Sequence, residues 1–138
     1  MRAAGTILIL LLSFVYRAAQ PFSYNVSLYD SQNIGLSHNT VTGLAMDHNG
    51  FLWVGTIDGL NRFDGKSVKI YRHDRRDSTS ISNSFIHGVL EDQEGNLWIG
   101  TRDGGINKFD LITEKFTHFT YSEEKENGIP NAPITLFF

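Results

Sequence analysis

Cysteine is absent from this 138-residue chain, which excludes disulfide bonds, thiol nucleophiles and cysteine-linked lipid anchors. Charge of one sign is also scarce, because 12 Lys and Arg stand against 15 Asp and Glu, a formal net charge of −3. No basic stripe interleaved with aromatic residues is present, so we expect no nucleic-acid partner for this segment. The longest apolar run, Thr6–Val15, has too few residues to span a bilayer.

That run follows Met1 and Arg2, and together they have the charged start and short apolar centre of a secretory signal. We predict that residues 1–19 are a signal peptide and that the rest of the chain is exported. Cleavage after Ala19 would put Arg17 where a small residue is preferred, so an uncleaved amino-terminal anchor is the alternative. Export without cysteine fits a bacterial envelope better than a small eukaryotic secreted domain.

One motif occurs twice. The stretch "FLWVGTIDGLNRFDG", which begins at Phe51, nearly matches "NLWIGTRDGGINKFD", which begins at Asn96. Matching residues lie 45 positions apart, and after the inserted Gly105 the spacing becomes 46. A period between roughly 20 and 50 residues is typical of solenoids, propellers and arrays.

Each repeat contains short apolar runs separated by turn residues, which is typical of strands in antiparallel hairpins. For the first repeat we predict four strands: Val41–Met46, Phe51–Thr56, Leu60–Phe63 and Val68–Tyr71.

The turn after the first strand has the pattern Asp-x-x-Gly, at Asp47–Gly50 and again at Asp92–Gly95. The Asp can accept hydrogen bonds from turn amides, and the Gly can adopt the positive φ of a type I turn followed by a bulge. A calcium loop needs oxygen ligands at alternate positions and a distal Glu, which are missing here. We therefore interpret both aspartates as turn residues.

The second predicted strand is apolar on both faces, since Phe51 and Trp53 point to one side while Leu52 and Val54 point to the other. The sequence offers no helix to cover either face, so copies of the sheet must cover them. This predicts an all-β fold, a β-propeller fragment of four-stranded antiparallel blades with two complete repeats and partial flanking strands.

In such a fold, we expect the mid-strand tryptophans, Trp53 and Trp98, to fill the space between adjacent blades rather than to stack on sugars. Gly55 and Gly100 would allow the close approach of the neighbouring blade.

The segments "NTVTGLAMDHNGFLWVGTIDGLNRFDG" and "NSFIHGVLEDQEGNLWIGTRDGGINKFD" resemble the repeat of the two-component regulator propeller family. The resemblance covers about Gly35–Phe138 and implies the periplasmic sensor region of a bacterial hybrid two-component regulator, anchored in the inner membrane. Full members continue into an immunoglobulin-like domain, a membrane span, a histidine kinase, a receiver and a DNA-binding module. Nothing in this sequence resembles the kinase, so we assign no enzymatic activity, catalytic residue or cofactor to it.

By this resemblance, Tyr24–Tyr29 would form an outer strand that closes the propeller ring, and "NAPITLFF" would begin a third, truncated blade. The expected segments are a leader at 1–19, the outer strand and lead-in at 20–36, blade 1 at 37–80, blade 2 at 81–128 and the start of blade 3 at 129–138.

The resemblance also implies a ligand, since such sensors typically recognise oligosaccharides released from polysaccharides. The remaining blades of a longer parent protein would be further partners. A structural or protein-binding propeller is an alternative reading. A propeller enzyme, such as a lyase or glycosidase, is another, because the Asp-x-x-Gly turn is superficially similar to the Asp-box of sialidases.

An up-and-down strand order puts turns 47–50 and 64–67 on one side of the disc, which we call the turn side. The opposite, connector side contains segments 57–59, 73–83, 102–105 and 122–131. Ligands of propellers usually bind on this side, where the loops that lead into the innermost strands converge.

On the connector side, His38, Asn83 and Arg102 depart from the repeat and are our candidate ligand-binding residues. Asp58 and Asp103 are weaker choices, because they belong to a recurring turn. The five histidines occupy five different repeat positions, so the sequence predicts no metal site: His38, His48, His73, His87 and His118.

Overall fold

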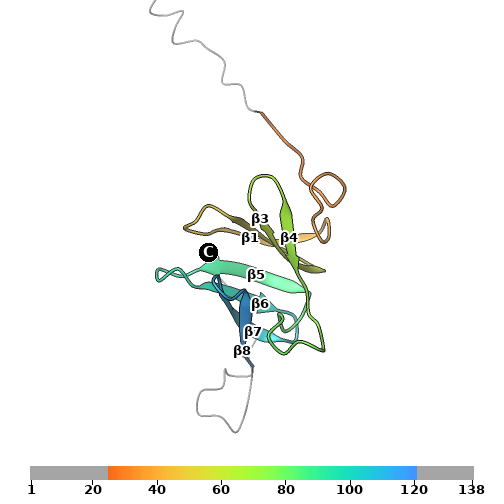
Figure 1. Ribbon diagram of the computed structural model, residues 1–138. Coiled ribbons are helices and arrows are strands. Elements are labelled where there is room, and N and C mark those ends of the chain that lie inside the picture. Colours follow the sequence, from red (N-terminus) through yellow and green to blue (C-terminus); the bar gives the residue numbers. More distant parts are fainter. Residues whose placement is uncertain (1–24, 121–138) are drawn as a thin grey trace, which may run out of the picture.

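The computed structural model describes residues 25–120, which form two four-stranded antiparallel sheets and no helix (Figure 1). Each sheet runs in simple sequence order, with every strand paired to the next, as expected for propeller blades. Blade 1 contains β1 (Val41–Met46), β2 (Leu52–Thr56), β3 (Gly59–Phe63) and β4 (Val68–Tyr71). Blade 2 contains β5 (Ile86–Glu91), β6 (Leu97–Thr101), β7 (Gly105–Asp110) and β8 (Lys115–Phe119).

The all-β architecture and the four predicted strands of the first repeat are confirmed, with shifts at two ends. Phe51 lies before β2 because it closes the turn: its carbonyl oxygen accepts from the amide of Asp47 at 3.0 Å. Gly59 joins β3, where it pairs with Thr56 of β2.

The Asp-x-x-Gly turns have the predicted conformation, with φ of 85° at Gly50 and 82° at Gly95. Asp47 Oδ1 accepts from the amides of Asn49 and Phe51, both at 3.0 Å. The other carboxylate oxygen, Oδ2, accepts from the indole Nε1 of Trp53 at 2.8 Å. Each such aspartate therefore links its turn to a tryptophan of the next strand, a contact that the turn interpretation alone did not predict.

Blade 2 repeats this arrangement, since Asp92 Oδ2 accepts from Trp98 Nε1 at 2.7 Å. This bond, together with the Asn96 side chain and the amides of Asn96 and Glu94, lowers the pKa of Asp92 to about 2.

The two blades stack through their innermost strands, β1 and β5, which lie side by side (Figure 1). A Cβ at Gly43 would lie 3.0 Å from the Cα of Gly88, and one at Gly55 would lie 2.7 Å from Ile86 Cγ2. No side chain fits at Gly55 without displacing the other blade, which confirms its predicted role. The equivalent contact of Gly100 would be with a third blade, outside the described residues, and stays a prediction.

The main core lies between the blades. Trp53 is fully buried there, with its ring centroid 5.2 Å from that of Phe109, as predicted. Trp98 is only partly buried and points to the opposite side of blade 2, where its ring lies 5.5 Å from that of Phe119. The blade 2 side chains in this core are Ile81, Ile86, Val89, Leu97, Ile99, Phe109 and Phe116.

Residues 25–30, where we predicted the outer strand, have no strand conformation, and the ring-closing pairing involves residues outside 25–120 and stays a prediction. A strand needs a hydrogen-bonding partner, and the last blade that would provide it is not among residues 25–120. Instead, Tyr29 packs its ring 5.5 Å from that of Phe63, and Asp30 Oδ1 accepts from the amides of Gln32 and Asn33 in a tight turn.

The leader at 1–19, the residue Tyr24 and the truncated third blade at 129–138 lie outside the described residues, so the domain boundaries remain predictions. Within the described part of the chain, no helix is long and apolar enough to cross a membrane.

Candidate functional site

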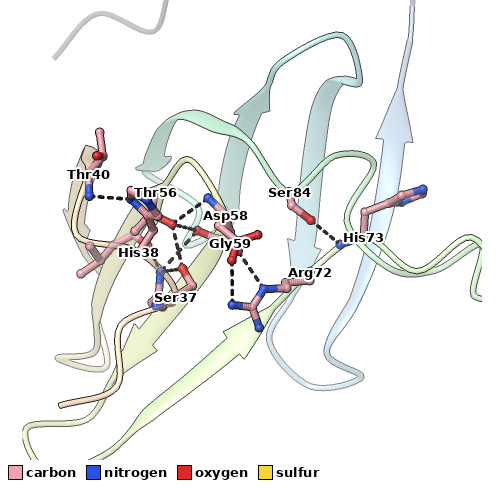
Figure 2. A network of polar contacts seen from close by, with 11 residues as sticks. Ser37, His38, Thr40, Thr56, Asp58, Gly59, Arg72, His73 and Ser84 are labelled. Carbon is pink, nitrogen blue, oxygen red and sulfur yellow. Dashed lines mark hydrogen bonds and ion pairs between the residues drawn. The ribbon is translucent and has the colours of Figure 1, made fainter. Parts of the chain in front are cut away.

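A buried polar network holds the connector side of blade 1 together (Figure 2). Ser37 donates its amide to Asn61 Oδ1 at 2.8 Å, and its hydroxyl lies 2.7 Å from that of Thr56. Asn61 Nδ2 donates to Ser37 Oγ at 2.8 Å and to the carbonyl of Val54 at 2.9 Å. Since Asn61 and Thr56 are fully buried, this network fixes the chain entering β1 to the hairpin between β2 and β3.

Blade 2 contains the same network, built from Ser82, Thr101 and Asn107. Ser82 donates its amide to Asn107 Oδ1 at 3.0 Å and accepts from Asn107 Nδ2 at 2.8 Å. Sequence reasoning missed both networks. The available signal was polar residues recurring at 45 or 46 positions next to or inside otherwise apolar strands.

Asp58 is bound by an arginine of its own blade. Arg72 donates from Nη2 to Asp58 Oδ2 at 3.0 Å and from Nε to the Asp58 carbonyl at 2.9 Å (Figure 2). Beyond it, the hydroxyl of Ser84 accepts from the amide of His73 at 3.1 Å. Asp58 therefore stabilises the start of the connector between the blades.

The side chains of two of the three candidate residues accept hydrogen bonds from backbone amides two residues further along the chain. His38 Nδ1 accepts from the amide of Thr40 at 2.9 Å, and Asn83 Oδ1 accepts from the amide of Phe85 at 2.8 Å. The two positions are 45 apart, so the same local bond occurs in both blades although the residues differ.

The third candidate, Arg102, is exposed. It contacts Phe85, the residue whose amide donates to Asn83. The Arg102 amide donates to the carbonyl of Phe85 at 2.9 Å, and its guanidinium lies 5.0 Å from the centre of the Phe85 ring. His87 packs against the same ring at 5.3 Å. We call Asn83, Phe85, His87 and Arg102 the Phe85 cluster. Within residues 25–120, no hydrogen bond, ion pair or ring contact joins His38 to it.

Sequence reasoning missed Phe85 and His87, although a signal was present. Every member of the Phe85 cluster differs from its counterpart in blade 1. The counterparts are His38, Thr40, Thr42 and Ile57.

Asp103 lies next to the Phe85 cluster, is exposed, and has a positive φ of 59°. Unlike Asp58, it forms no ion pair within the described range. No group of three or more His, Cys, Asp or Glu side chains in residues 25–120 could hold a metal ion. The side chains available to a ligand here are an aromatic ring, a guanidinium, an amide, an imidazole and a carboxylate.

The family model described as two component regulator propeller matches residues 35–58 and 80–103. Histidine kinase P4 from Formosa agariphila is 43% identical over 83 residues, which are 59% of this chain and 6% of that protein.

Two similar solved structures are described as extracellular domains of hybrid two component systems from B. thetaiotaomicron, and both are 33% identical in sequence. The first has a TM-score of 0.59 and covers 64% of this chain and 12% of its own. The second has a TM-score of 0.58 and covers 73% and 14%. The chain thus spans a small part of the length of each relative.

Each matched segment starts in the lead-in to a blade and ends at the hairpin between its second and third strands. The two component regulator propeller model therefore matches one segment in each blade, residues 35–58 and 80–103.

Proposed function

We propose that this chain provides two blades of the periplasmic or extracellular propeller of a hybrid two-component protein, and that this propeller senses oligosaccharides. The observation that carries the proposal is the pair of regulator propeller repeats, in a fold shared with extracellular domains of hybrid two component systems. The predicted export signal is consistent with that location.

The Phe85 cluster supports a hydroxyl-rich ligand. The C–H faces of a sugar can pack on an aromatic ring, while its hydroxyl groups can accept from a guanidinium or amide and donate to a carboxylate. Phe85, Arg102, Asn83 and Asp103 offer these groups on the connector side.

Signalling rather than catalysis is the proposed role of this segment. The ligand would change how the blades pack or move, and a kinase elsewhere in the parent protein would respond. The histidine kinase name of one relative supports such a parent.

The test is isothermal titration calorimetry, in which each of a panel of oligosaccharides is titrated into the parent protein that contains these two blades. Arg102→Ala should weaken binding about tenfold or more, because a hydrogen bond from a charged group contributes about 1.5–3 kcal/mol. Lys66→Ala is the matched control, since it removes one exposed positive charge from the turn side.

Unchanged affinity in Arg102→Ala would contradict the site. Binding to none of the sugars, or cleavage of a sugar during the titration, would contradict oligosaccharide sensing and favour a protein-binding or an enzymatic propeller.

A further inference from the structure

The free polar groups of the Phe85 cluster are mostly hydrogen-bond donors. Because the Phe85 amide donates to the Asn83 side chain at 2.8 Å, Asn83 must present its oxygen there, which leaves its Nδ2 group free. Within residues 25–120, this Nδ2 group, the Arg102 guanidinium and the His87 ring form no hydrogen bond or ion pair. A guanidinium offers five N–H donors, an amide two and an imidazole at least one. The cluster therefore fits a ligand group that only accepts hydrogen bonds.

Arg102 is a cation without a counter-ion in the described part of the chain. On the same side of blade 1, by contrast, Arg72 pairs with Asp58 at 3.0 Å. The Arg102 guanidinium instead lies over the aromatic ring of the cluster, and a guanidinium stacked on a ring keeps the donors in its own plane free. Those donors match the paired oxygens of a carboxylate or a sulfate, which have no hydrogen to donate in return.

His87 is a β-bulge residue at the connector end of β5. The pairing between β5 and β6 continues on both sides of His87, which itself has no partner residue. Bulges re-aim side chains, and here the imidazole lies against the Phe85 ring, with 5.3 Å between the ring centres. The Phe85 backbone is also fixed, since its amide donates to Asn83 and its carbonyl accepts from Arg102. The backbone that presents both rings is thus ordered before a ligand binds, which favours affinity.

A blade that follows blade 2 in the parent propeller should leave these donors free. The counterparts of the cluster in blade 1 already have a following blade packed beside them, namely blade 2. None of these counterparts forms a hydrogen bond or an ion pair with blade 2: His38, Thr40, Thr42 and Ile57. The cluster should therefore remain available to a ligand in a complete propeller.

We infer that the Phe85 cluster recognises an acidic sugar, whose anionic group accepts hydrogen bonds from Arg102, with Asn83 Nδ2 and the His87 ring as further donors. The inference rests on the proposed sensing of oligosaccharides and narrows the ligand to glycans that carry a negative charge. The carboxylate of a uronic acid and the sulfate ester of a sulfated sugar both provide such a group. Asp103 forms no ion pair within the described residues, so its carboxylate can accept from the hydroxyl groups of the same sugar.

The experiment is isothermal titration calorimetry of the parent protein that contains these two blades, with acidic tetrasaccharides and their neutral forms. One arm compares a panel of uronate tetrasaccharides with the same molecules after reduction of each carboxyl group to an alcohol. The other arm compares a panel of sulfated tetrasaccharides with their desulfated forms. In one of the two arms, the acidic form should bind about tenfold or more tightly than its neutral form, because hydrogen bonds between charged groups are the stronger ones. The arm that shows this preference identifies the anionic group.

Two variants test whether the preference depends on the cluster. Arg102→Gln keeps a side chain that can donate hydrogen bonds but removes the charge, so it should reduce the preference about tenfold. Asn83→Asp keeps an oxygen for the Phe85 amide but replaces the free Nδ2 donors by a negative charge, so it should abolish the preference. Both variants should still bind the neutral form, and this retained binding shows that they are folded.

The matched controls are Lys66→Gln and Asn49→Asp, which make the same two changes of charge on the turn side. Both side chains are exposed, and Asn49 lies in the turn after β1 while Lys66 lies in the turn after β3. Because these turns are at the opposite end of the blade from the cluster, both controls should retain the wild-type preference for the acidic form.

Equal affinity for the acidic and the neutral forms in both arms would overturn the inference and leave oligosaccharide sensing in place. A preference that persists in both Arg102→Gln and Asn83→Asp would put the anionic group at another site and would overturn the inference as well. Binding of no tetrasaccharide of either kind would contradict the proposed function itself, and the inference with it.

Discussion

A single aspartate in each blade joins a hairpin turn to a tryptophan side chain. In blade 1 both partners are buried, because Asp47 is 4% exposed and Trp53 is fully enclosed. The carboxylate thus satisfies two turn amides and an indole N–H that could not reach water. This explains why the Asp, the Gly and the Trp keep the same spacing in both repeats.

Trp53→Ala should lower the free energy of unfolding by about 3–5 kcal/mol, as large-to-small changes in a core do. Trp98→Ala is the comparison within the same chain, and should cost less because Trp98 is only partly buried. Urea denaturation of both variants measures the difference. Equal losses would mean that Trp98 is covered as fully as Trp53 in solution.

Gly50→Val should lower the free energy of unfolding by about 1–2 kcal/mol, since a β-branched residue is strained at positive φ. The effect isolates backbone conformation, because a Cβ at this position would meet no atom within 4 Å. Gly50→Asn is the control and should cost less, as Asn tolerates such φ values. Equal melting temperatures for Gly50→Val and the wild-type chain would contradict the turn geometry.

The turn roles of Asp47 and Gly50 could be predicted from local sequence, because turn chemistry acts over a few residues. The ligand candidates could be predicted only in part. Asn83 and Arg102 were recognisable as departures from the repeat, whereas their common neighbour Phe85 depends on how the connector folds against the β6–β7 hairpin.

Elements of the two blades are joined on the turn side by two ion-pair groups. His48, in the turn after β1, contacts Glu91 at the end of β5. Glu114, in the turn before β8, forms ion pairs with Lys69 and with Arg62, whose Nη2 lies 3.1 Å from Glu114 Oε1. It also accepts a hydrogen bond from the Tyr71 hydroxyl at 3.3 Å. The hydrogen bond from Lys69 is the main cause that lowers the pKa of Glu114.

The His48 contact predicts a pH dependence. The hydrogen bond with Glu91 raises the pKa of His48 above its ordinary 6.5 in the folded chain. The resulting stabilisation is fully present below pH 6.5 and is lost as the pH rises through the raised pKa of the folded state. The melting temperature should therefore decrease as the pH rises from about 6 to above 8.

Calorimetry at several pH values measures this dependence, and His48→Gln should remove most of it. His87→Gln is the control, because His87 is exposed and makes no ion pair within residues 25–120. A decrease of the same size in His48→Gln and the wild-type chain would contradict a role for the His48–Glu91 pair.

Strand positions were predictable because apolar runs and turn residues alternate within short windows. The Glu114 group was not, since the connection between the paired residues Phe109 and Phe116 is two residues longer than that between Phe63 and Val68, so Glu114 has no repeat counterpart. The outer strand around Tyr29 stays a prediction, because its conformation depends on a partner strand outside the described residues.

The whole molecule has its main core between two sheets and not within either one. Trp53 and Leu60 come from blade 1, while Ile81, Ile99 and Phe109 come from blade 2. In repeat architectures of this kind, each unit is stabilised largely by its interface with the next.

The two blades should therefore unfold together. A calorimetric scan of the chain should show one transition in which the calorimetric and van't Hoff enthalpies agree. Gly55→Val, which would push against Ile86, should lower the temperature of that single transition without splitting it. Two resolved transitions would show that each blade is stable by itself.

The propeller class was predictable from the repeat, because only stacked copies cover sheets that are apolar on both faces. The number of blades in a ring was not, since closure depends on contacts beyond a single repeat.

The placement of the two tryptophans, the only ones in the chain, gives each a separate optical environment. Trp53, sealed between the blades, should emit at short wavelength and resist quenching by acrylamide until the protein unfolds. Trp98 should emit at longer wavelength and be quenched readily while its face is open. Replacing either one by Phe leaves a single indole, so the intrinsic fluorescence of this protein can follow the inner interface and the open face independently.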